Sequence, residues 1–147
     1  MEKMYEIQQI KQVIKEVEGS EKHIVRSPID AALVAAEIIG DEDREVFLVM
    51  CLNTKNRIVV VHRCHVGSLA ASIVHPREVF KSAILNNAMS IIVSHQHPSG
   101  DTTPSREDIE VTRRLIEAGK VLGIEVLDHL IVNAHAEFTS LKEKGYL

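Results

Sequence analysis

Two histidines separated by a single residue, His95 and His97, have the side-chain type and the spacing to bind a metal ion. Alternate side chains of an extended backbone point to the same side, so the two imidazole rings can converge on one ion. Zinc in a catalytic site usually takes three protein ligands from histidines and carboxylates and leaves the fourth position to water. We therefore expect a divalent-metal site here, with catalytic zinc as the first choice, provided that a carboxylate completes it.

Two carboxylates compete for the third ligand position. Asp101 lies four residues after His97 in a turn-forming Pro-Ser-Gly-Asp segment, where its carboxylate can instead accept hydrogen bonds from loop amides. Asp108 lies in the first turn of a helix expected to begin near Ser105, and that turn carries it back toward the histidines. Ser105 and Asp108 also have the spacing of a helix capping box, which is a purely structural role. Spacing alone leaves the choice between the two aspartates open.

The two cysteines, Cys51 and Cys64, lie inside apolar stretches of a chain that is 45% hydrophobic. A chain with this much apolar material needs no disulfide for stability, so we expect two reduced thiols. Cys64 and the neighbouring His65 are nevertheless an alternative source of metal ligands. A fourth ligand from this pair would make the site closed and structural instead of open and catalytic.

The elements that must position these side chains follow from the spacing of apolar residues. Residues 4–17 carry an apolar stripe at helical spacing, and Ser27 followed by Pro28 is typical of a helix start. Helices are expected over 4–17, 28–39, 76–87 and 105–122, and strands over 45–52, 57–65, 88–94 and 124–132. Strands that alternate with helices after an initial hairpin predict a mixed β-sheet flanked by helices, in the α/β (α+β) class.

Composition excludes several classes of function. A chain of 147 residues with a net charge of −4 lacks the basic surface that binds phosphate backbones, and 3% aromatic residues leave little for base stacking. We therefore do not expect direct binding to nucleic acid. The first twenty residues interleave charges with apolar residues, so we expect neither a signal peptide nor a membrane anchor, and a cytoplasmic location.

The segment His95-Gln-His-Pro-Ser-Gly-Asp, with Pro104-Ser-Arg-Glu-Asp108 after it, resembles the RadC-like branch of the JAMM (MPN- or JAB-type) zinc metalloprotease superfamily. The likeness extends over most of the chain, from Arg44-Glu-Val-Phe to Leu127-Asp-His-Leu-Ile. It implies a JAB/MPN architecture, related to that of cytidine deaminases, for residues 27–147. Residues 1–26 would then form an N-terminal helical extension.

The resemblance also assigns the site residues. The implied Zn²⁺ ligands are His95, His97 and Asp108, which resolves the choice between the two aspartates. Ser105 would lie beside the reacting centre, and Glu45 matches the glutamate that acts through the metal-bound water.

Two further observations bear on this assignment. Glu45 leads an otherwise apolar strand face that also carries Phe47, where an unpaired carboxylate would be costly to bury. Asp128 and His129 match the family as well. Adjacent strand residues face opposite ways, so at most one of these two can support the metal site.

The implied function is a zinc-dependent hydrolase of amide bonds, of metallopeptidase or isopeptidase type, acting on a peptide or protein. The alternative is a RadC-type accessory protein of DNA repair or recombination that acts through partners without peptidase activity. A zinc deaminase would need His-x-Glu and Pro-Cys-x-x-Cys, and neither occurs. An inactive interaction domain is disfavoured by the intact ligand set. Motifs do not identify the substrate, and the apolar stripe of residues 4–17 leaves room for a homo-oligomer.

Overall fold

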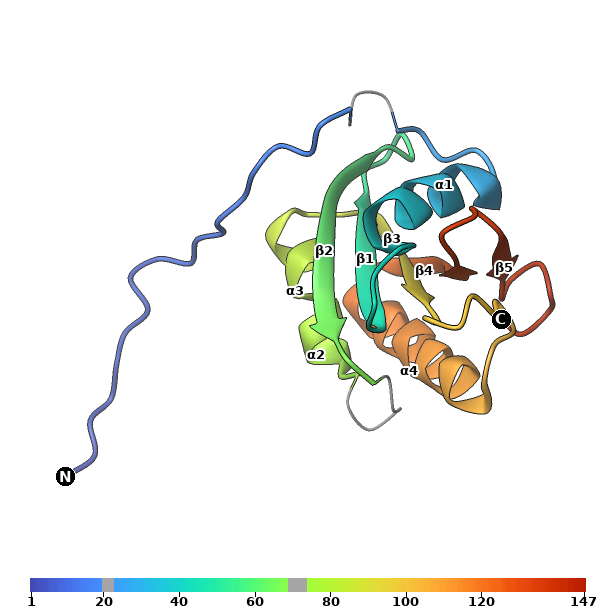
Figure 1. The fold of residues 1–147 in the computed structure, drawn as a ribbon. Coiled ribbons are helices and arrows are strands. Elements are labelled where there is room, and N and C mark those ends of the chain that lie inside the picture. The colour runs from blue at the N-terminus through green and yellow to red at the C-terminus, as the bar shows by residue number, and fades with distance from the viewer. Residues whose placement is uncertain (20–22, 69–73) are drawn as a thin grey trace.

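A five-stranded mixed β-sheet, with the strand order β2-β1-β3-β4-β5, organises the computed structural model, which describes residues 1–19, 23–68 and 74–147 (Figure 1). The strands are β1 (Val46–Leu52), β2 (Ile58–Val66), β3 (Ser90–Gln96), β4 (Glu125–Val132) and β5 (Phe138–Ser140). The helices are α1 (Pro28–Ile39), α2 (Pro76–Val79), α3 (Lys81–Leu85) and α4 (Arg106–Leu122). Strands β3 and β4 are parallel and the other neighbours are antiparallel, which confirms the predicted mixed sheet.

Helices cover the sheet on both faces. Helix α1 lies on one face, and α2, α3 and α4 lie on the other (Figure 1). Alternate residues of β1 accordingly belong to two cores, with Phe47 and Val49 on the α4 face and Leu48 and Met50 on the α1 face. Because both faces are covered, every residue of β1 and of β3 is buried. Strand β1 is accordingly apolar without alternation, whereas β3 also carries buried polar residues at its ends.

Helix α4 has a clear signal at each end. At its start, Ser105 accepts a hydrogen bond from the backbone of Asp108, and the Asp108 carboxylate accepts one from the Ser105 amide. At its end, Gly123 adopts the left-handed conformation that glycine tolerates best. One turn earlier, Gly119 lies so close to the chain leading into β4 that a β-carbon there would overlap the carbonyl oxygen of Ile124. The capping box thus fixes where α4 begins, and the close approach at Gly119 fixes its end against the chain that enters β4.

The helix predicted over residues 4–17 is wrong. Residues 1–17 contain no helix, and this segment runs outside the sheet and its helices (Figure 1), with a side-chain contact from Gln12 to Asn86. Isolated helices of this length are marginal in water, and the side chains of Ile7, Ile10 and Val13 remain exposed instead of packing on a core. The extension predicted over 1–26 is thus not helical where it is described, and residues 20–22 lie outside the described residues.

Two other predicted elements have different bounds. The single helix expected over 76–87 is two short helices that meet at the buried Phe80. The strand expected over 88–94 begins at Ser90 and continues through Gln96, so His95 belongs to the sheet itself. In the part of the chain that the structure describes, every helix is too short or too polar to cross a membrane.

Candidate metal centre

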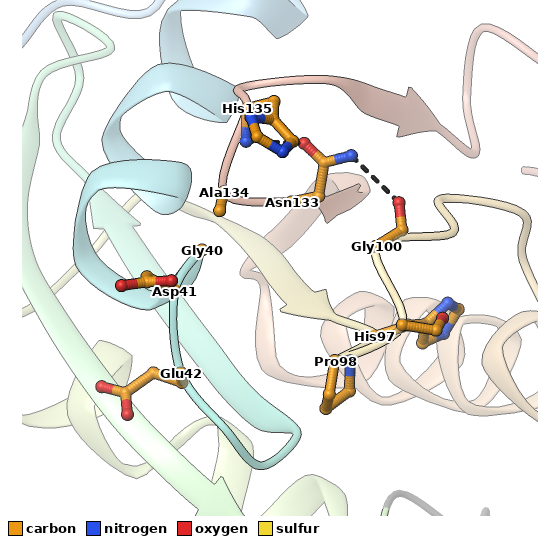
Figure 2. Close-up of a pocket in the computed structure, with 10 residues that line it drawn as sticks. Gly40, Asp41, Glu42, His97, Pro98, Gly100, Asn133, Ala134 and His135 are labelled. Carbon is orange, nitrogen blue, oxygen red and sulfur yellow. Dashed lines mark hydrogen bonds between the residues drawn. The ribbon is translucent and has the colours of Figure 1, made fainter.

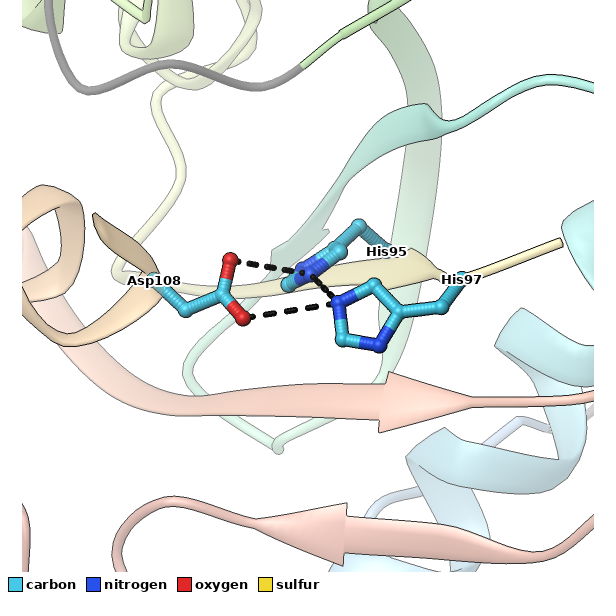
Figure 3. Close-up of side chains that lie close together, drawn as sticks. All are labelled: His95, His97 and Asp108. Atoms are coloured by element: carbon cyan, nitrogen blue, oxygen red, sulfur yellow. Dashed lines mark hydrogen bonds and ion pairs between the residues drawn. The ribbon is translucent and has the colours of Figure 1, made fainter. Parts of the chain in front are cut away.

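The side chains of His95, His97 and Asp108 converge where β3 ends and α4 begins (Figure 3). The two histidine Nε2 atoms are 3.1 Å apart. Asp108 Oδ1 lies 3.1 Å from Nε2 of His95, and Oδ2 lies 3.5 Å from Nε2 of His97. Three atoms that carry lone pairs thus face one point from three directions.

These separations fit a zinc ion. Nitrogen and oxygen ligands at zinc distances of 2.0–2.1 Å in a tetrahedron are about 3.3 Å from one another. The Nε2–Nε2 separation of 3.1 Å and the carboxylate distances of 3.1 Å from Oδ1 and 3.5 Å from Oδ2 are close to this value. Three ligands from two histidines and one carboxylate also leave the fourth tetrahedral position open, as catalytic zinc sites do. The donor set therefore fits Zn²⁺.

The carboxylate of Asp108 takes part in both of the roles that spacing left open. Its Oδ2 accepts the amide hydrogen of Ser105 at 2.8 Å, which caps the helix, while Oδ1 points at His95. Capping therefore orients the ligand instead of competing with it. Asp101, the rival candidate, is exposed, and its carboxylate accepts a hydrogen bond from the amide of Thr103.

Asp101 nevertheless supports the site through its backbone. Its carbonyl oxygen is 2.7 Å from Nδ1 of His97. A carbonyl oxygen only accepts hydrogen bonds, so Nδ1 of His97 carries the ring proton and donates it. The Nε2 of His97 is then the nitrogen that faces the other ligands, as a metal-binding imidazole requires.

Of the two adjacent family matches, His129 faces the metal centre and Asp128 faces away. The His129 Nε2 atom is 2.7 Å from Nδ1 of His95, and its Nδ1 atom is 2.6 Å from the hydroxyl of Thr112. Asp128 instead accepts a hydrogen bond from Ser140, the last residue of β5, on the opposite face of the sheet. A register shift in the β3–β4 pairing, which adds the extra residue Leu127 to β4, sets this orientation.

Burial and charge act together on the ionisable groups. Burial alone would raise the pKa of Asp108, but its interactions with His95 and His97 outweigh burial and hold that pKa well below the usual range. The Asp108 carboxylate raises the pKa of His97 against the effect of partial burial, with help from the Asp101 carbonyl and the charge of Glu45. Burial lowers the pKa of His129 well below its ordinary value, so this ring is neutral at pH 7.

Glu45 lies next to the centre on the α4 face. The amide of Gly67 donates to its carbonyl at 2.7 Å, which continues the β1–β2 ladder and puts Glu45 on the same face as Phe47. The Phe47 ring stacks on His95 and meets His129 edge-on. Glu45 is half-buried, and its negative charge contributes to the raised pKa of His97. The structure therefore brings Glu45 within electrostatic reach of a ligand.

Ser105 is the N-cap residue of α4 and is exposed. Its hydroxyl oxygen accepts the amide hydrogen of Asp108 at 3.1 Å. A hydroxyl that accepts in this way keeps its own proton for donation to a further group. The side chain can thus cap the helix and still donate to a bound molecule.

The alternative ligands from Cys64 and His65 do not join the centre. Among the described residues, the only group of three or more potential ligands is His95, His97 and Asp108. Both cysteines are free thiols, as expected. Burial, together with the charge of Glu78, raises the pKa of Cys64 to about 11, so this thiol stays protonated at neutral pH.

Comparison with known proteins assigns this site to a family. The model of the RadC-like JAB domain matches residues 25–146, which include the three candidate ligands and Glu45. The chain belongs to the RadC-like JAB domain family. The resemblance seen in the motifs is therefore confirmed.

Curated relatives of this RadC-like JAB domain include several UPF0758 proteins. One from Geobacillus sp. (strain WCH70) is 54% identical over 126 residues, covering 86% of this chain and 55% of the relative. YsxA of Bacillus subtilis (strain 168) is 52% identical over 134 residues, covering 91% of this chain and 58% of the relative. The chain thus spans somewhat more than half the length of these curated relatives, whose names state no activity.

A hollow of about 210 Å³ opens beside His97 in this RadC-like JAB domain (Figure 2). Asp41 and Glu42 lie across it from His97 and Pro98 (Figure 2). The remaining lining residues are Gly40, Ser99, Gly100, Asn133, Ala134 and His135. His97 is the more exposed of the two histidine ligands, at 19% of its side chain against 1% for His95. Of the three candidate ligands only His97 lines the hollow, and its ring lies on the side away from Asp41 and Glu42 (Figure 2), so the hollow is next to the metal centre and does not contain it.

Sequence reasoning missed two residues that hold this site together. Thr112 bonds to His129, and its position four residues after Asp108 on the same helix face was the available signal. Asn133, at the end of β4, donates to the carbonyl of Gly100 at 3.0 Å and so fixes the loop that follows His97 (Figure 2). Nothing in the spacing of Asn133 pointed to this role.

Proposed function

We propose that this RadC-like JAB domain is a zinc-dependent hydrolase of amide bonds, of metallopeptidase or isopeptidase type, acting on a peptide or protein. The observation that supports this most is the open, three-ligand arrangement of His95, His97 and Asp108 with Glu45 close by. A closed structural site would need a fourth protein ligand, and none joins the group in residues 1–19, 23–68 and 74–147.

Zinc held by these ligands would supply a water of lowered pKa, about 7, and would polarise the carbonyl under attack. The protein's own residues divide the remaining work. Glu45 accepts the proton of the attacking water and returns it to the leaving amine, which is general base and then general acid catalysis. Its half-buried position keeps the carboxylate open to a bound water and within electrostatic reach of His97.

Ser105 provides the second contribution. Its hydroxyl proton is left for donation because its oxygen already accepts from Asp108, so it can stabilise negative charge on the carbonyl oxygen of a bound amide. Ser105 is exposed and Glu45 is only half-buried, so a peptide segment can reach both side chains from solvent. Phe47 and the buried strands behind the site exclude water from the other side.

The test is Glu45→Gln, assayed against a panel of linear peptides and isopeptides with zinc-loaded protein. Removing the proton acceptor should lower kcat/KM by roughly 10²–10⁴-fold, the usual worth of a general base, while zinc content by elemental analysis stays unchanged. Glu78→Gln is a matched control, because Glu78 is exposed and pairs with Lys81 on α2 and α3. Normal turnover in Glu45→Gln would remove Glu45 from the mechanism.

A further inference from the structure

A chain of buried hydrogen bonds connects two of the proposed metal ligands by a route behind the metal centre. The Nδ1 atom of His95 is 2.7 Å from Nε2 of His129. Nδ1 of His129 is 2.6 Å from the hydroxyl of Thr112, and that hydroxyl is 2.6 Å from the backbone carbonyl of Asp108. The chain crosses from β3 to β4 to α4, and its two ends, His95 and Asp108, meet again at the centre.

Only one arrangement of protons satisfies every link. The Asp108 carbonyl can only accept, so the single hydroxyl proton of Thr112 must be donated to it. The Thr112 oxygen then has to accept, which puts the ring proton of His129 on Nδ1. The Nε2 atom of His129 consequently carries a lone pair and must accept a proton from Nδ1 of His95.

We infer that Thr112 and His129 are positioning residues that hold His95 with its proton on Nδ1 and its Nε2 lone pair directed at the metal. This rests on the proposed zinc site. Neutral imidazole occurs in two tautomers, and only the one protonated at Nδ1 can bind a metal through Nε2. The backbone carbonyl of Asp108 sets the direction of donation along this series of hydrogen bonds, and no side-chain substitution removes that carbonyl.

Burial of these residues strengthens the control of the His95 tautomer. The four residues are between 0% and 5% exposed, so water does not stand in for a lost partner within the chain. The chain also ties the first turn of α4, which carries Asp108, to the strand that carries His95, so it positions two ligands at once. Outer partners of metal-binding histidines are typically worth 10–100-fold in metal affinity.

The first experiment measures Zn²⁺ affinity of the full chain by competition with a chromophoric chelator. Thr112→Val keeps the shape of the side chain and removes the hydroxyl, and we expect it to weaken zinc binding by roughly 10–100-fold. Thr112→Ser restores the hydroxyl and should stay close to wild type. The matched control is Thr139→Val, which removes a hydroxyl that donates to Thr102 and takes no part in the chain from His95 to Asp108, and it should also bind zinc as wild type does. Unchanged affinity in Thr112→Val, or equal losses in all three variants, would overturn the inference.

The second experiment reads the tautomers directly, by long-range ¹H–¹⁵N NMR of the metal-free full chain at mildly alkaline pH. Wild type should show His95 and His129 both protonated at Nδ1, and Thr112→Val should shift both toward Nε2 protonation. Wild-type His95 with a proton on Nε2 and none on Nδ1 would overturn the inference even if Thr112→Val did not fold. Neither experiment uses a substrate, so a protein that passes both yet hydrolyses no amide counts against the proposed function alone.

Discussion

Two buried aspartates lie on opposite faces of the same sheet, and their neighbours differ in kind. Asp108 is 5% exposed and Asp128 is 4% exposed. The carboxylate of Asp128 is surrounded by donors, namely the Ser140 hydroxyl and the amides of His129 and Lys142. The carboxylate of Asp108 has one amide partner and otherwise faces two imidazole nitrogens.

The difference shows what makes a buried acid a candidate site. A carboxylate whose neighbours all donate hydrogen bonds is satisfied by the protein and stabilises the fold. A carboxylate that meets other atoms with lone pairs needs a proton or a cation between them. Burial alone does not separate Asp128 from Asp108, and the chemistry of the neighbours does.

The largest expected effect is the loss of zinc affinity when Asp108 is substituted. Asp108→Asn removes a charged ligand, so we expect Zn²⁺ affinity to fall by more than about 100-fold, beyond the usual effect of an outer partner. Elemental analysis and chelator competition measure it. Asp101→Asn is the matched control, since Asp101 is exposed and contributes to the site only through its backbone carbonyl. Zinc loss in Asp101→Asn with retention in Asp108→Asn would reverse the ligand assignment.

A smaller and different effect is expected from Asp128→Asn. The amide supplies one acceptor oxygen where the carboxylate supplies two, so some buried donors lose their partner at a cost of about 1–3 kcal/mol in the free energy of unfolding. Urea denaturation of the zinc-free protein measures this, and zinc affinity should stay near wild type. The contrast between the two aspartates fails if Asp128→Asn loses zinc while its stability is unchanged.

The smallest expected effect is on the free energy of unfolding at acidic pH. Because the pKa of Asp108 is held well below its unfolded value of about 3.9, this group stabilises the zinc-free fold above that pH. The contribution is lost as pH falls below about 4 toward the lowered pKa of the folded state. Unfolding free energies measured from pH 5 downward should therefore fall more steeply for wild type than for Asp108→Asn. Parallel curves for the two proteins would contradict the lowered pKa.

The main elements of the fold were predictable because apolar spacing reports directly on burial. The hairpin of β1 and β2, the buried strand β3 and the helix α4 all follow from that pattern. The helix over residues 4–17 did not form, because periodicity shows which side chains a helix could bury and not whether a surface exists to receive them. Helical periodicity without a surface to pack against was not enough to form a helix in this segment.

The convergence of His95, His97 and Asp108 was predictable, and the residues that hold them in place were not. His95 and His97 follow from strand alternation, and Asp108 was selected by the family motif. The choice between Asp128 and His129 depends on the extra residue Leu127 in β4, which strand alternation does not reveal. Thr112 was overlooked because a threonine inside a helix is ordinarily read as a surface or packing residue, and its hydroxyl matters only through a ring from another strand.

The close approach at Gly119 makes the metal centre sensitive to substitutions far from it. Gly119 lies eleven residues along α4 from Asp108, a distance of about 16 Å along a helix. A larger residue there would have to push the end of α4 away from the chain entering β4. Because a helix moves as a rigid rod, the displacement would reach its first turn and separate Asp108 from the histidines. Variation among homologous sequences should therefore be as restricted at this remote glycine as it is at the ligands themselves.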